Sequence, residues 1–299
     1  MIKQAPYLKK GDKIALVCPA KKLPKSIDHA IAVLEGWGLE VVIGKSLYAS
    51  HHQFAGTDSL RTADIQHFLD DPEIKAIISG RGGYGTIRII DQLDFSTFKQ
   101  HPKWFVGFSD ITVLLSHIIA ETGLQCIHAQ MPYTLEEATA ESLISLRKSL
   151  FGEKQDYSYT SEFNNKTGEA TGQLIGGNLT LLCALQGSVS EMDFKDKILF
   201  LEDIGEQEYA VDRMLRMLER AGKLKDLRAL VIGAFNEIAE EKIPFGQSVN
   251  EVIREVVKDY DYPVCFNFPT GHIDNNLSMV LGAEVHLTVA SNNVQFKYL

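Results

Sequence analysis

The sequence predicts an α/β protein with an N-terminal parallel-sheet domain and a smaller C-terminal α/β domain. Three observations support this prediction: short β-branched runs alternate with amphipathic helical stretches, the alternation stops in a polar segment near the middle, and it then resumes. A chain of 299 residues with 45% apolar residues can build two such domains. We place the domains at residues 1–155 and 171–299, joined by a linker at 156–170.

The first half repeats a strand followed by a helix. Each expected strand is a short apolar run, and each expected helix has apolar residues three or four positions apart. Turn-forming residues mark the helix ends, as Gly36 and Gly38 do for the first helix and Pro72 for the second. In chain order, the expected strands are 13–20, 39–45, 75–80 and 103–110, and the expected helices are 26–38, 59–71, 86–93 and 111–123.

The segment 150–171 is polar, rich in turn-forming residues and without a helical or strand period, so the linker is placed there. Beyond it, the expected helix 208–224 carries an apolar face that we interpret as core, made of Val211, Met214, Leu215, Leu218 and Ala221. The chain is expected to end in a hairpin that turns at 291–293. The other expected elements are helices 179–188 and 248–260 and strands 197–204, 228–235 and 262–268.

Composition and charge argue against several classes of function. A net charge of -9 disfavours binding to nucleic acid or to anionic membranes, and we interpret Lys21, Lys22 and Lys25 as a solvated loop. The N-terminal apolar run is too short for a signal sequence or a membrane span, and the four cysteines are widely spaced. We therefore expect a cytoplasmic protein. No pair of His, Asp or Glu has metal-ligand spacing, so we expect no metal.

Polar residues at the carboxyl ends of the strands are the first candidates for a site, because open α/β sheets bind ligands there. Ser109 lies between a strand and a helix, as a nucleophile at a sharp turn does; alternatively, Ser109 or Asp110 caps the helix. A serine nucleophile needs a base and an orienting acid. His272 is the best base because turn residues surround it, although a hydrogen-bonded loop histidine would look the same. Glu202 and Asp203, at the end of one strand, both fit the acid.

The segment GRGGYG at 80–85 follows a strand and permits two interpretations. It matches G-x-G-x-x-G and could bind a dinucleotide. It could also be a turn whose backbone N–H groups bind an oxyanion or a substrate carboxylate, with Arg81 or Arg88 adding positive charge. The dinucleotide fingerprint normally follows the first strand of its unit, and the first strand here ends in 18–20. This position favours the anion-binding turn.

Together these motifs resemble the LD-carboxypeptidase family, serine peptidases that trim D-alanine from murein tetrapeptide and whose relatives include the microcin C self-immunity hydrolases. The resemblance implies a flavodoxin- or amidotransferase-like N-terminal domain, an active site at the domain junction and a homodimer. It also argues against a dinucleotide at 80–85, so we expect no cofactor. The motifs that carry it, in family order, are GDKIALVCPA, SGRGGYGTIRIIDQLD, VGFSDITVLL, LIGGNLTLL, LEDIGEQEYAVDRML and PTGHIDNNLSMVLGAEVHL.

The resemblance also implies a role for individual residues. Ser109 in GFSD would be the nucleophile, Glu202 in LED the triad acid and His272 in TGH the general base. The backbone N–H groups of Gly83 and Asp110 would form the oxyanion hole.

A small peptide, the murein tetrapeptide, is the substrate that the resemblance implies, and Arg81, Tyr84 and Asn178 are expected to contact it. One departure from the family pattern is visible. The family usually follows the histidine with glycine, whereas this chain has Ile273, which puts the backbone shape of that loop in question.

Two rival functions stay open at this point. A microcin C-type immunity hydrolase would cut aminoacyl-nucleotide conjugates with the same triad, but it needs an aromatic platform for the nucleobase. Residues 156–170 offer Tyr157, Tyr159 and Phe163 but no tryptophan, and the short chain favours the carboxypeptidase. A non-catalytic ligand-binding protein would keep the glycine turn and could dispense with the serine and the histidine; labelling by a fluorophosphonate distinguishes it from a hydrolase.

Overall fold

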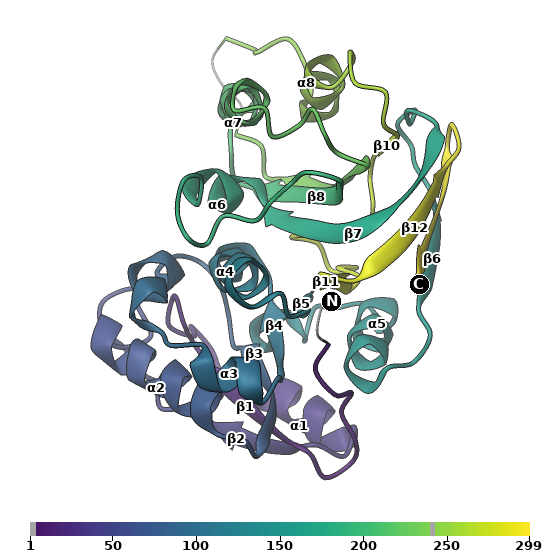
Figure 1. Ribbon diagram of the computed structural model, residues 1–299. Helices are drawn as coiled ribbons and strands as arrows, with labels where there is room; N and C mark the ends of the chain where they lie inside the picture. Colours follow the sequence, from purple (N-terminus) through teal and green to yellow (C-terminus); the bar gives the residue numbers. More distant parts are fainter. Residues whose placement is uncertain (1–3, 240–242) are drawn as a thin grey trace.

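The computed structural model describes residues 4–239 and 243–299, and within these residues the chain forms two sheets covered by helices (Figure 1). The first sheet has six strands in the order β11-β5-β4-β3-β1-β2. Five of them are parallel and β11 is antiparallel. They are β1 (Lys13–Val17), β2 (Glu40–Ile43), β3 (Ile74–Ser79), β4 (Trp104–Gly107), β5 (Cys126–His128) and β11 (Met279–Leu281).

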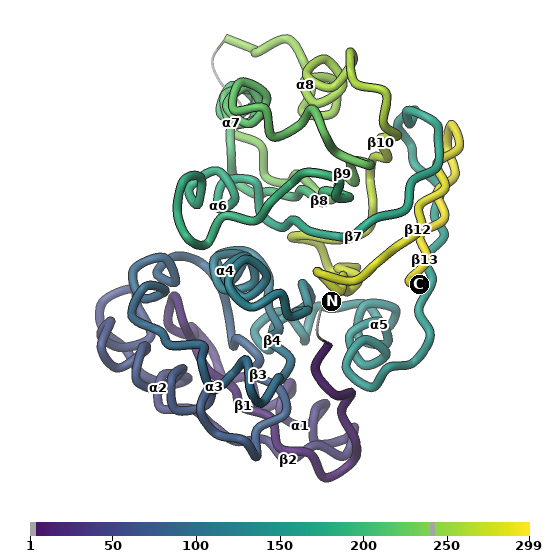
Figure 2. Tube along the Cα trace, viewed as in Figure 1, coloured from purple at the N-terminus to yellow at the C-terminus, as the bar shows by residue number. Residues whose placement is uncertain are grey.

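The second sheet has seven strands in the order β10-β9-β8-β7-β12-β13-β6. From β10 to β7 the strands are parallel, and from β7 to β6 they are antiparallel. Figure 2 shows the β12–β13 hairpin beside β6 at the outer end of this sheet. The strands are β6 (Asp156–Thr160), β7 (Gly168–Asn178), β8 (Lys197–Ile204), β9 (Ala229–Asn236), β10 (Val264–Cys265), β12 (Glu284–Val289) and β13 (Asn293–Tyr298).

The apolar core has three parts, each packed between helices and a sheet. One part lies on the face of the first sheet that α1 and α5 cover, and a second lies under α6, α7 and α8. The third joins α2, α3 and α4 to the inner faces of both sheets, and α4 lies between the two halves (Figure 1). These helices are α1 (Asp28–Gly36), α2 (Asp58–Asp70), α3 (Ser96–Gln100), α4 (Thr112–Thr122), α5 (Ala140–Phe151), α6 (Leu179–Ala184), α7 (Glu208–Arg220) and α8 (Val249–Val256).

This architecture confirms the predicted α/β class, with a parallel sheet in the N-terminal half and a second sheet in the C-terminal half. The predicted core face of α7 is confirmed for Val211, Leu215 and Leu218, which are fully buried, and for Met214, which is partly buried against them. It is wrong for Ala221, which is exposed and follows the last residue of the helix. Residues 86–93 form two short 3-10 turns, Thr86–Arg88 and Ile90–Gln92, in place of one helix.

The prediction that residues 150–171 lack regular structure is wrong. Within them, β6 forms the outer strand of the second sheet, so the proposed linker 156–170 begins with a strand. Tyr157 of β6 is buried, whereas Asp156 and Ser158 are exposed. Five residues with this alternation give too short a pattern to stand out among polar neighbours. Residues 171–299, which we assign to the second domain, also contribute a strand to the first sheet, because β11 pairs with β5 there.

Candidate active site

Ser109 lies two residues beyond the end of β4 and has a left-handed backbone, with φ of +64°. Such a conformation costs a non-glycine residue about 1–3 kcal/mol, and it is often found where a side chain must be held at a functional position. Ser109 is partly exposed, although its neighbours Phe108 and Asp110 are buried. The turn therefore presents one hydroxyl at the carboxyl end of β4, as a strand-to-helix nucleophile turn does.

Asp110, the residue after the serine, has a buried side chain. Its Oδ2 accepts a hydrogen bond of 2.9 Å from the backbone N–H of Thr86, and burial raises the pKa of its carboxyl. Within the described residues, neither Ser109 nor Asp110 caps the helix that follows. The alternative that these residues serve as a helix cap is therefore wrong.

His272 and Glu202 form a buried hydrogen-bonded pair. Nδ1 of His272 lies 2.6 Å from Oε2 of Glu202, whose side chain is fully buried, and the histidine side chain is 14% exposed. Because a carboxylate oxygen only accepts hydrogen bonds, this contact places the ring proton on Nδ1. Nε2 is then free to accept a proton from a substrate or a nucleophile.

The pKa of His272 lies above its ordinary value. Burial acts to lower the pKa, but the charge and hydrogen bond of Glu202 raise it, and the charges of Asp203 and Glu237 add to this effect. The net direction is upward, because a buried imidazolium beside carboxylates is stabilised more by their charge than it is destabilised by lost hydration. A base with a raised pKa accepts protons more readily.

The loop that carries His272 is fixed at several points. Gly271 has a φ of +115°, and its N–H donates to Oδ1 of Asn276 at 2.9 Å. Asn236 at the end of β9 donates to the carbonyl oxygen of His272 at 2.6 Å. Ile273, where the family has a glycine, does not have a positive φ and faces a pocket that Asn236 and Pro269 also line. The departure at Ile273 therefore leaves the imidazole in place.

Glu202 and Asp203 could not be separated from the sequence, and their contacts in the structure differ completely. Asp203 accepts hydrogen bonds from the amide of Asn178, at 2.8 Å, and from the backbone and hydroxyl groups of Thr180. Successive strand residues point to opposite faces, so only Glu202 reaches His272. Asn178 is 3% exposed and also caps α6, which fits a supporting role better than the predicted substrate contact.

The glycine turn at 80–85 packs directly on Ser109. A Cβ on Gly82 would lie 3.0 Å from Cβ and 3.2 Å from Oγ of the serine. Gly83 has a φ of +113°, and its N–H donates no hydrogen bond to any of the described residues. The turn therefore packs on the serine at Gly82, and the next residue has a backbone N–H that is unpaired among the described residues. An oxyanion site needs such an N–H donor.

Arg81 and Tyr84 flank these glycines. Nη1 of Arg81 donates to the carbonyl oxygen of Lys22 at 2.9 Å, and its guanidinium lies 4.6 Å from the ring centre of Tyr133. Tyr84 is 45% exposed and its ring is 6.2 Å from that of Phe54. Both side chains lie on the turn that meets Ser109, and their contact with a substrate stays a prediction.

The predicted residues meet from both halves of the chain, but one link is absent. Among the described residues Oγ of Ser109 makes no hydrogen bond, to His272 or to any other group. The ring of Phe108 contacts the imidazole instead, with 4.8 Å between ring centres. Hydrogen bonds of this kind often tighten only when a substrate is bound.

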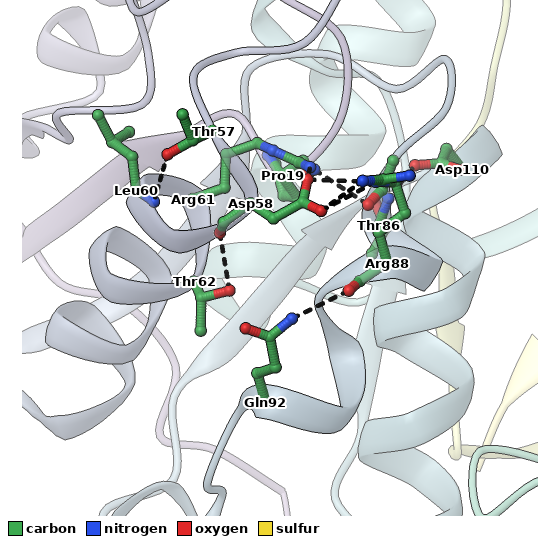
Figure 3. Close-up of polar contacts among 11 residues, drawn as sticks. Pro19, Thr57, Asp58, Leu60, Arg61, Thr62, Thr86, Arg88, Gln92 and Asp110 are labelled. Atoms are coloured by element: carbon green, nitrogen blue, oxygen red, sulfur yellow. Dashed lines mark hydrogen bonds and ion pairs between the residues drawn. The ribbon is translucent and has the colours of Figure 1, made fainter. Parts of the chain in front are cut away.

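A buried arginine, Arg61, contacts the last glycine of the turn. Figure 3 shows its side chain beside Pro19 and Asp58. Arg61 on α2 is fully buried and donates to the carbonyl oxygens of Pro19 and of Gly85, the latter at 3.0 Å, and to Asp58. Asp58 also accepts hydrogen bonds from Arg88, at 2.6 Å and 3.0 Å, which hold the pKa of its carboxyl low. One helix thereby fixes both the end of β1 and the last glycine of the turn.

We expect Arg61→Met to destabilise the protein by about 2–4 kcal/mol, because it leaves the buried carbonyl oxygen of Pro19 without a donor and removes one of the two donors to that of Gly85. Urea denaturation of the purified protein measures this change. Arg88→Met is the matched control: Arg88 is 46% exposed and Asp58 keeps Arg61, so its loss should cost less than about 1 kcal/mol. Equal losses in the two variants would contradict the role given to Arg61.

Several residues that build this site carry no signal in the sequence. Arg61 reads as one more polar residue of a helix, and Phe108 as part of an apolar strand. Asn276 is the exception, because it lies in the polar run that surrounds His272 and could have been singled out as a loop residue.

Comparison with known proteins adds to this geometry. The family profile of the LD-carboxypeptidase N-terminal domain matches residues 14–129, and that of the C-terminal domain matches residues 171–287. A Bacillus subtilis (strain 168) protein named "Probable murein peptide carboxypeptidase" is 36% identical over 291 residues, which cover 95% of this chain and 91% of that protein.

Two solved structures have the same fold. The crystal structure of muramoyltetrapeptide carboxypeptidase from Oxalobacter formigenes matches with a TM-score of 0.87 and 30% identity, covering 96% of this chain and 98% of that chain. The microcin C7 self-immunity protein MccF matches with a TM-score of 0.88 and 22% identity, covering 98% of each chain, and this likeness concerns the fold alone. With both family profiles matched, the chain belongs to the LD-carboxypeptidase family and is a serine peptidase of that type.

Proposed function

We propose that this enzyme hydrolyses the amide bond between the L-centre of a dibasic residue and a terminal D-amino acid, releasing D-alanine from murein tetrapeptide. The observation that carries the proposal is the 2.6 Å contact between His272 and buried Glu202, on the loop whose imidazole touches the residue before Ser109. The names of the Bacillus and Oxalobacter relatives support the choice of a murein peptide. The enzyme needs no metal or other cofactor for this reaction.

The first half of the reaction forms an acyl-enzyme. Oγ of Ser109 attacks the carbonyl carbon of the penultimate residue while Nε2 of His272 takes the hydroxyl proton. Glu202 holds the ring in the required tautomer and stabilises the imidazolium that forms. The N–H groups of Gly83 and Asp110 donate to the oxyanion, and each such donor is worth about 3 kcal/mol.

The intermediate then collapses and the amide C–N bond breaks. His272 returns the proton to the leaving nitrogen, so the D-amino acid departs as a neutral amine. Water enters, His272 takes one of its protons, and the hydroxide adds to the ester carbonyl. Release of Ser109 with the proton from His272 regenerates the enzyme.

The alternative, a hydrolase of aminoacyl-nucleotide conjugates, would need an aromatic platform, and the three residues considered for it are engaged in other contacts. Tyr157 is 8% exposed and its hydroxyl donates to the carbonyl oxygen of Ser278 at 2.6 Å. The hydroxyl of Tyr159 donates to a backbone carbonyl at 2.9 Å, and Phe163 lies under the guanidinium of Arg254. All three aromatic side chains are packed within the second half of the chain, which favours the peptidase.

The proposal includes a cytoplasmic location, a homodimer and no nucleic-acid or membrane partner. The four cysteines, Cys18, Cys126, Cys183 and Cys265, are unpaired, which fits a reducing compartment. No helix in the described parts of the chain has the length and apolar character of a membrane span. The dimer rests on the resemblance to the family, and light scattering of the purified protein tests it.

The decisive experiment compares substrates. We expect the wild-type enzyme to release free D-alanine from murein tetrapeptide, followed by mass spectrometry, and to leave an aminoacyl-sulfamoyl nucleoside intact. A peptide ending in L-alanine serves as the matched control. Cleavage of the nucleoside conjugate with no release of D-alanine would transfer the assignment to the immunity-type hydrolase.

A further inference from the structure

Lys21 lies against the glycine turn in a way that the sequence did not suggest. Its backbone N–H is 3.4 Å from the carbonyl oxygen of Gly82, and its aliphatic side chain runs across Gly83. A Cβ on Gly83 would lie 2.5 Å from Cδ, 2.8 Å from Cγ and 3.1 Å from Cβ of the lysine. The ammonium is two covalent bonds beyond Cδ, so it lies close to the turn that packs on Ser109. We had interpreted Lys21 as part of a solvated loop.

Other cationic side chains near the glycine turn already have polar partners. Arg88 is paired with Asp58 at 2.6 Å, and Lys25 with Glu136 at 2.7 Å. Nζ of Lys22 donates to the hydroxyl of Ser50 at 3.1 Å.

Arg81 is also held, by the carbonyl oxygen of Lys22 and by the ring of Tyr133. Lys21, in contrast, has no ion pair and no side-chain hydrogen bond within residues 4–239 and 243–299. Among the described residues, Lys21 is thus a partly buried lysine beside the glycine turn whose side chain has no polar partner.

The chemistry of the proposed reaction places a negative charge at this position. In a substrate with a free C-terminus, the terminal carboxylate carbon is three bonds from the carbonyl carbon that the serine attacks. An oxyanion held by Gly83 therefore brings the carboxylate near the same turn. We propose that Lys21 binds the C-terminal carboxylate of the substrate and thereby restricts the enzyme to terminal residues. This inference rests on the proposed function, because it assumes the same scissile bond.

The test compares two substrates that differ only in this charge. One is the murein tetrapeptide with a free terminal D-alanine, and the other is the same peptide ending in D-alanine amide. A charge-assisted hydrogen bond contributes enough to change an equilibrium by about tenfold or more. For Lys21→Met we expect kcat/KM on the free acid to fall at least about tenfold and kcat/KM on the amide to change less than about twofold.

Two further variants separate charge from packing. Lys21→Arg keeps the cation and should retain most of the preference for the free acid. Lys22→Met removes the adjacent exposed charge and should leave the preference of the wild type unchanged. Equal losses on both substrates in Lys21→Met would mean that the lysine only supports the turn, and no loss on either would remove it from the site; both results overturn the inference.

The proposed function and this inference fail in different ways. If the wild-type enzyme released nothing from either peptide, the proposed function would be wrong and the inference would fall with it. If the wild type cleaved the free acid and Lys21→Met kept the same preference, only the inference would be wrong.

Discussion

Ser109→Ala is expected to lower kcat for D-alanine release by about 10⁴-fold or more, since removal of a serine nucleophile leaves only the catalysis that binding and the oxyanion site supply. The backbone at this position is strained, with φ of +64°, and alanine can adopt the same conformation at a similar energetic cost. The fold should therefore survive. Release of D-alanine from murein tetrapeptide, followed by mass, measures the loss.

A covalent probe gives an independent test of the same serine. A fluorophosphonate should label the wild-type protein at Ser109, as read by peptide mass, and should not label Ser109→Ala. Ser96→Ala is a matched control, because Ser96 begins a helix of the same half of the chain and bonds only to Asp94. The assignment of Ser109 as nucleophile would be refuted if the probe labelled another residue of the wild type in its place. More than a tenth of wild-type activity in Ser109→Ala would also refute it.

The sequence predicted the positions of the site better than its contacts. The carboxyl ends of the strands could be found because each is an apolar run that stops at polar residues, and the structure brings Ser109, Glu202 and His272 to such ends or to the loop beyond one. Which of Glu202 and Asp203 faces the histidine could not be read from the same run. That choice depends on how the second sheet lies against the loop at 269–276, which is a tertiary property.

The supporting contacts were out of reach for a similar reason. Arg61 bonds to Gly85, 24 residues away, and the side chain of Lys21 covers Gly83 across a still longer interval. Neither residue forms a local pattern, and both look like ordinary solvated charges in the sequence. β6 was missed because its five residues alternate between exposed and buried positions at the edge of a sheet, among polar neighbours.

Glu202→Gln should leave the histidine loop in place and still disable the enzyme. A glutamine can also donate to Nδ1, which permits the wrong tautomer, and it cannot stabilise the imidazolium. In a serine protease of another family the equivalent change costs about 10⁴-fold in kcat, and we expect a loss of about 10³–10⁴-fold here. Steady-state release of D-alanine at a fixed, saturating peptide concentration measures it.

The same variant should also shift the pH profile in a defined direction. In the wild type, His272 must be neutral to accept a proton, so activity falls as the pH drops through its raised pKa. Burial alone lowers that pKa, and Glu202 supplies the largest opposing contribution. Without this carboxylate the pKa falls, and the acid limb of the residual activity moves to lower pH.

Asp203→Asn provides the matched control for this shift, because it changes the adjacent carboxylate that faces Asn178 and Thr180 rather than the histidine. It should lower the free energy of unfolding, since buried donors around Asp203 lose a charged acceptor. It should move the acid limb less than Glu202→Gln does. A wild-type acid limb that persists in Glu202→Gln would mean that Glu202 does not set the pKa of the base. A limb that moved equally in both variants would instead indicate a general field of the carboxylates, without a specific role for the hydrogen bond between Glu202 and His272.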